Sequence, residues 1–160
     1  MSLQTQVNIE MAKAVPGDKA TANPFVYPAE SPKAGEDVRC GRFVWLDASG
    51  RAAGGAAGAV STQPLGLVER VIDKFNYDLK SPGALTINNN SPLTVGMRGD
   101  YWVECAGAAA AGQKVFANTD DGAIAAGAAG ASMSGHVETA WTVVQGGPAG
   151  AVIKISNWSA

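Results

Sequence analysis

The sequence predicts an all-β fold: a β-sandwich or barrel-like body of the jelly-roll type, with an extended N-terminal arm. Short segments rich in β-branched and aromatic residues recur along the chain, and turn signals separate them every ~8–12 residues. No stretch of useful length has the 3.6-residue apolar period of an amphipathic helix. At 160 residues the chain is long enough for one domain with a core of its own.

Residues 1–35 are expected to form the arm, and residues 36–160 a single β-rich domain. Prolines recur through the second half of the arm and disfavour a helix there. An extended segment of this kind is either disordered or docked, on the same chain or on a neighbour, and its apolar residues favour docking. The arm residues expected to contact a partner are Val7, Ile9, Met11, Val15 and Phe25.

The first part of the arm carries a strand-like pattern. Val7, Ile9 and Met11 alternate with polar residues, which places them on one face of an extended segment. Because an arm without a helix needs partners for its backbone groups, we expect contact with another subunit to order residues 1–27.

The body is expected to consist of short strands joined by loops. A short helix of alanines over 106–113 is conceivable by propensity alone, and 48–59 and 127–135 are expected as Ala/Gly loops. Residues 75–96, with three consecutive asparagines and two Ser-Pro pairs, are expected to be a loop insertion. The predicted strands cover residues 36–47, 64–73, 97–106, 135–145 and 151–158, with a hairpin over 113–127 that turns at Asp121-Gly122.

The four tryptophans lie in four different predicted strands and are expected to dominate a core that is otherwise rich in small residues. Trp158, close to the end of the sequence, is the tryptophan best placed to face a partner instead. Two cysteines, Cys40 and Cys105, do not make a disulfide scaffold, and the sequence leaves open whether they pair.

Catalytic chemistry finds little support in the sequence. His136 is the only histidine, so any Ser-His-Asp or Cys-His arrangement would need it, and no nucleophile motif lies near it. His136, Cys40 and Cys105 lack the spacing of metal ligands, and residues 118–122 lack the ligand pattern of a calcium loop. We therefore expect no enzyme activity, no metal and no cofactor.

Charge and hydropathy argue against further classes of protein. Twelve basic and 14 acidic residues give a net charge of -2, without the basic face of a nucleic-acid-binding protein. No run of ~18 apolar residues predicts a membrane span, and the first residues lack the pattern of a secretory signal. The expectation is synthesis in the cytoplasm and no membrane or nucleic-acid partner.

The order of several segments resembles the structural cement, or capsid decoration, proteins of tailed bacteriophages. These segments are the opening MSLQTQVNIEMAKAVPGDKATANP, GRFVW at 41–45, GLV at 66–68, GDYWVEC at 99–105 followed by AGAAAAGQKVFAN, and HVETAWTVVQGGPAGAVIKIS at the end. The resemblance covers most of the chain, and its motifs are strand and turn patterns.

The resemblance implies a non-enzymatic virion protein, made in the bacterial host, that sits on the outer capsid surface and clamps neighbouring major capsid subunits. It also implies a homo-oligomer, a trimer rather than a dimer. The alternative is a β-rich carbohydrate- or receptor-binding module of a phage particle. Such a module usually exposes aromatic clusters on its loops, whereas the long loops of this sequence consist of small and polar residues.

Overall fold

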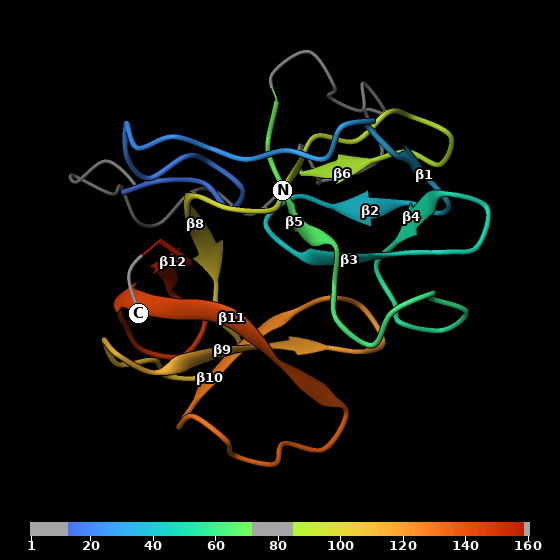
Figure 1. Cartoon of the computed structure of the whole chain (residues 1–160). Coiled ribbons are helices and arrows are strands. Elements are labelled where there is room, and N and C mark those ends of the chain that lie inside the picture. Colours follow the sequence, from blue (N-terminus) through green and yellow to red (C-terminus); the bar gives the residue numbers. More distant parts are fainter. Residues whose placement is uncertain (1–12, 72–84, 159–160) are drawn as a thin grey trace, which may run out of the picture.

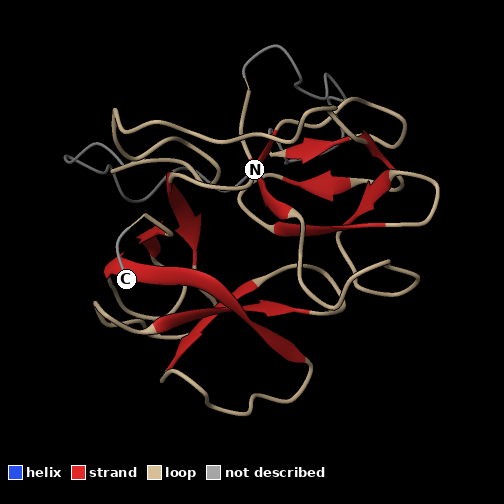
Figure 2. Ribbon diagram, in the orientation of Figure 1, coloured by secondary structure: helices blue, strands red, loops and turns tan. Residues whose placement is uncertain are grey.

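The computed structural model describes residues 13–71 and 85–158, and this part of the chain contains strands and no helix (Figure 2). The all-β prediction is therefore confirmed. The strands are β1 (Lys33–Ala34), β2 (Val38–Arg39), β3 (Phe43–Leu46), β4 (Arg51–Ala53), β5 (Gly66–Val68), β6 (Thr86–Ile87), β7 (Val95–Gly96), β8 (Asp100–Glu104), β9 (Lys114–Asn118), β10 (Ile124–Gly127), β11 (His136–Gln145) and β12 (Val152–Ser156).

The strands form two five-stranded sheets and one small ribbon (Figure 1). The C-terminal sheet has the order β10-β9-β11-β12-β8 and is antiparallel throughout. The N-terminal sheet has the order β1-β4-β3-β5-β7, in which only the β1–β4 pair is parallel. The ribbon pairs β2 with β6. The sheets curl, so the body is a sandwich with the character of a half-barrel.

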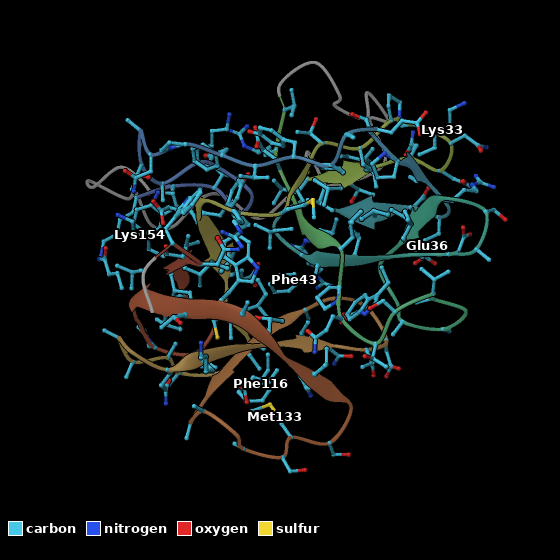
Figure 3. The ribbon with its side chains drawn as sticks, in the orientation of Figure 1. Lys33, Glu36, Phe43, Phe116, Met133 and Lys154 are labelled. Carbon is cyan, nitrogen blue, oxygen red and sulfur yellow. The ribbon has the colours of Figure 1, made fainter. Side chains whose placement is uncertain are left out.

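The N-terminal sheet is the middle of three layers. Phe43 and Trp45 face the C-terminal sheet and join the larger core cluster, whereas Val44 between them belongs to a second cluster with the β2–β6 ribbon. Figure 3 shows Phe43 between the two sheets. Because alternate residues of a strand point to opposite faces, a strand in this layer is buried on both sides, as all three residues of β5 are. This explains the imperfect apolar alternation of residues 64–73.

A loop covers part of the outer face of the C-terminal sheet. Phe116 of β9 is 1% exposed but points away from the main core, toward the loop that carries Met133 (Figure 3). The loop over 127–135, expected from its Ala/Gly composition, therefore also shields an aromatic ring.

Two local predictions were wrong. The strand expected over 36–47 is broken between β2 and β3 by a turn at Gly41, whose φ is 74° and whose backbone packs against Pro16. The loop expected over 48–59 contains β4. Residues 106–113, where alanine propensity alone would allow a short helix, form none, as the shortness of the run predicts. The backbone N–H groups of Ala109 and Gly112 donate instead to the carbonyls of Gly147 and Val143.

The segment 75–96 is described only from residue 85 onward, and that part contributes β6 and β7. Ile87, Leu93 and Val95 are buried in the second core cluster. Within the described ranges no helix is long and apolar enough to cross a membrane.

Cys40 and Cys105 are both buried and unpaired. They lie in different core clusters, Cys40 under the ribbon and Cys105 between the two sheets. Burial raises the pKa of the Cys40 thiol to about 11. The pairing that the sequence left open does not form.

Candidate functional site

The arm docks along β8, the edge strand of the C-terminal sheet. The backbone N–H groups of Gly17, Ala20 and Val26 donate to carbonyls of Trp102, Asp100 and Arg98, at 2.8, 2.8 and 3.0 Å. This covers an edge that would otherwise present unpaired backbone groups. The expectation that another subunit orders residues 1–27 is therefore wrong for residues 17–26, which find their partners on the same chain. Residues 1–12 lie outside the described residues.

A buried carboxylate fixes the arm to the body. Glu69, directly after β5, is 7% exposed and accepts hydrogen bonds from the hydroxyls of Tyr27 and Tyr101, at 2.8 and 3.0 Å. The ammonium group of Lys19 lies 3.3 Å from its second oxygen. We call Lys19, Tyr27, Glu69 and Tyr101 the Glu69 cluster; two of its members come from the arm and two from the body.

Aromatic packing surrounds the Glu69 cluster. Phe25 of the arm meets Tyr101 edge to face, with ring centroids 5.2 Å apart, and the Lys19 ammonium lies 4.9 Å from the Phe25 centroid. Gly96 leaves the space for the Tyr101 hydroxyl, which a Cβ at that position would meet at 2.1 Å. Burial, and then the Glu69 carboxylate, raise the pKa of Tyr101 above its usual value, so its hydroxyl stays a donor.

A second carboxylate anchors the next part of the arm. Asp100 is 4% exposed, and its Oδ2 accepts hydrogen bonds from Thr21 and Asn23, at 2.5 and 2.7 Å. Burial would raise the pKa of Asp100, but hydrogen bonds from Ser156, Thr21 and Asn23 outweigh it and hold the pKa below 3.8.

The docked arm should therefore loosen in acid. A carboxyl group whose pKa is lower in the folded state stabilises the fold above its unfolded pKa, and this contribution is lost as pH falls through the folded pKa. We expect the free energy of unfolding of the wild type to fall between about pH 5 and pH 2, and that of Asp100→Asn to fall less. Urea unfolding at a series of pH values measures this. Asp120→Asn, at an exposed turn, is the control and should keep the wild-type pH dependence; an Asp100→Asn profile equal to it would contradict the prediction.

Exposed apolar side chains gather where the arm passes the C-terminal strand. Val26, Met97 and Trp158 are 39%, 38% and 42% exposed. The carbonyl of Val26 accepts from the N–H of Met97 at 2.8 Å, and the Arg98 guanidinium lies 5.7 Å from the Trp158 ring. The indole N–H of Trp158 donates to the carbonyl of Pro24 at 3.0 Å. We call Val26, Met97, Arg98 and Trp158 the Trp158 patch.

A groove continues from this patch between the two sheets. Met97 belongs to both the patch and the groove. We call it the β11 groove, since one wall is the first half of that strand. Its lining residues are Gln63, Pro64, Leu65, Gly66, Met97, Glu138, Thr139, Ala140, Trp141 and Asn157.

The structure brings two of the expected contact residues to one corner. Phe25 and Trp158 flank Pro24, but Phe25 is partly buried against the core, whereas Trp158 is exposed. Val15 lies at a different place, in the turn that it closes with Asp18. Val7, Ile9 and Met11 lie outside the described residues.

Sequence reasoning missed the Glu69 cluster. A signal was present, because a glutamate follows directly on the apolar run GLV and charged residues are rarely buried without a partner. The partners themselves, on the arm and on β8, are more than 30 positions away from Glu69, and only the fold brings them to it. In the described ranges no group of three or more His, Cys, Asp or Glu side chains is arranged to hold a metal ion.

Two of the three comparisons with known proteins found a match. A solved chain from the capsid of Myoviridae phage XM1 is 20% identical, with a TM-score of 0.68 over 98% of this chain and 98% of that chain, which shows a shared fold. No curated protein matches the sequence. A family model described as XM1 gp53 minor capsid protein matches residues 3–157, nearly the whole sequence. The chain therefore belongs to the XM1 gp53 minor capsid protein family, and it is a structural, capsid-associated phage protein.

Proposed function

We propose that this protein is a capsid decoration protein, which binds the outer surface of the shell and clamps neighbouring major capsid subunits. The observation that carries the proposal is the Trp158 patch: three exposed apolar side chains and one arginine, held in place by the arm and the C-terminal strand. Family membership supports a capsid as the surface that such a patch contacts.

The way the patch is built suits a contact surface. The hydrogen bond to Pro24 and the contact with Arg98 hold the Trp158 ring in place, so little side-chain entropy is left to lose on binding. Clustered exposed apolar residues, in contrast to single ones, mark interaction sites on soluble proteins. Tryptophan and arginine are the residues most enriched among those that dominate binding energy.

Clamping would act by differential affinity. A protein that binds the mature shell better than the immature or unassembled one stabilises the mature shell by that difference. A homo-oligomer, in our proposal a trimer, would present several Trp158 patches at once and so gain affinity through multivalency. The partners proposed are the major capsid protein and further copies of the chain, without nucleic acid, membrane or enzymatic activity.

Replacing Trp158 by serine should weaken binding to expanded phage shells by about tenfold or more, since a central aromatic anchor contributes roughly 2 kcal/mol or more. Co-sedimentation of the purified protein with shells measures the affinity. Met97→Ser should weaken it by a smaller factor.

The matched control is Val60→Ser. Val60 is 64% exposed, more than any apolar residue of the patch, but it lies in the loop after β4, outside the patch. Shell binding that falls equally in Val60→Ser, or that stays unchanged in Trp158→Ser, would contradict the proposal. Binding to a glycan array, with none to shells, would favour a carbohydrate-binding module instead.

A further inference from the structure

We propose that the first half of β11 accepts an additional strand, residues 5–11 of a second copy of this chain, which lies in the β11 groove. The inference deepens the homo-oligomer included in the proposed function by naming its contact. Its test uses the protein alone in solution, so it can fail or succeed independently of shell binding.

The first half of β11 has a partner strand on one side only. β9 pairs with it from His136 to Glu138, whereas β12 pairs only from Thr142 onward. Gly135 and Val137 bond toward β9. Since bonding direction alternates along an antiparallel strand, the backbone N–H and C=O of Glu138 point the other way. No strand in the described ranges pairs with that side.

The groove beside this edge defines what would fit it. Its larger apolar side chains include Leu65, Met97 and Trp141, and its polar ones include Gln63 and Asn157. A free strand edge pairs with an extended backbone. Such a backbone presents alternate side chains to one face. The occupant should therefore be an extended segment with apolar residues at every second position.

The first twelve residues of the sequence contain such a segment. Over residues 5–11, TQVNIEM, the residues Val7, Ile9 and Met11 alternate with polar ones. Seven extended residues span about 23 Å. On β11, the N–H of His136 already donates to the carbonyl of Met133, and pairing with β12 begins at Thr142, so the open stretch lies between these two residues. The segment is long enough to lie along this stretch, and its alternating apolar residues fit the groove.

We take the donor to be a second copy because the described chain begins away from this edge. Met11 is only two residues from Lys13, a reach of about 7 Å. In Figure 1 the described chain begins, in blue, at the upper left, whereas the first half of β11 runs toward the lower right. Exchange of identical segments between copies is a common route to a closed symmetric oligomer.

Two variants, each with one added cysteine, test the contact. Ile9→Cys and Ala140→Cys are made in the full chain with tags of different mass, mixed, and oxidised mildly; the native Cys40 and Cys105 are buried and unpaired. Ala140 is exposed and lines the groove. A disulfide between the two differently tagged chains can form only between two copies of the protein. We expect at least about tenfold more of it than with the control pair Ile9→Cys and Ala149→Cys, because docking raises the effective concentration of the thiols.

A competition experiment and two contrary results complete the test of the proposal. A synthetic peptide of residues 2–12, added in excess, should suppress the cross-link. Equal yields from the Ala140→Cys and Ala149→Cys mixtures would overturn the proposal. So would an Ile9→Cys/Ala140→Cys double variant that closes its disulfide within a monomer, because the segment would then occupy its own groove.

Discussion

Replacing Glu69 by alanine should lower the free energy of unfolding by about 3 kcal/mol. The change removes the acceptor of two tyrosine hydroxyls and the counter-charge of Lys19 in one step. The Tyr101 hydroxyl is fully buried and would be left without its acceptor, which costs more than the hydrogen bond itself contributes. Urea unfolding followed by tryptophan fluorescence measures the loss.

The same variant should release the arm. Lys19 and Tyr27 contact the body through Glu69, so trypsin should cleave Glu69→Ala after Lys19 faster than it cleaves the wild type. Glu104→Ala is the matched control: Glu104 is exposed and forms a 3.6 Å ion pair with Arg39. Its removal should cost about 0.5 kcal/mol or less. Equal losses in the two variants would show that Glu69 does not anchor the arm.

Replacing Phe43 by alanine should cost about 3–5 kcal/mol, by the lost burial of the ring and the cavity left behind. The side chain is fully buried between the two sheets (Figure 3) and meets Trp141 edge to face, with centroids 6.1 Å apart. Phe43 therefore bridges the N-terminal sheet and the C-terminal sheet. Its removal should make the two sheets separate at lower denaturant concentration, which unfolding curves will record as a lower midpoint.

Two further variants identify the cause of that loss. Phe43→Leu keeps most of the volume and should lose less than half as much stability as Phe43→Ala, because the cavity is smaller. Val60→Ala, at a well-exposed position, should stay within about 0.5 kcal/mol of the wild type. A Phe43→Ala loss no larger than that of Val60→Ala would show that this ring does not hold the sheets together.

Much of the C-terminal half of the chain was predictable because consecutive strands there form hairpins. The hairpin over 113–127 appears as β9 and β10, and the strands expected at 135–145 and 151–158 appear as β11 and β12. The pairs β9–β10 and β11–β12 join consecutive strands in antiparallel fashion, so turn signals and alternation predict them. The bulges in β11 and the pairing of β12 with β8 have no such local signal. The N-terminal half was harder because its middle layer is buried on both faces and its pairings skip along the chain, as β1 with β4 and β2 with β6 do.

The residues proposed for partner contact could be named from the sequence, but their arrangement could not. Trp158, the tryptophan best placed to face a partner, is 42% exposed, whereas Phe25 packs inward on Tyr101 because Gly99 leaves room for its ring. Met97 and Val26 gave no signal of their own, since they become neighbours only when the arm lies along β8. The Trp158 patch is thus a product of arm docking.

The sequence by itself determined the β class, the extended arm and the Asp121-Gly122 turn, because turn chemistry and alternation are local properties. Only the tertiary structure decided which distant residues these features contact. Gly122 has a φ of 69°, which favours glycine, and a Cβ there would also lie 2.0 Å from the Phe43 carbonyl of the other sheet. Glu69 and Asp100 become anchors of the arm only because burial among distant donors makes an unpaired carboxylate costly, and no local pattern encodes that distance.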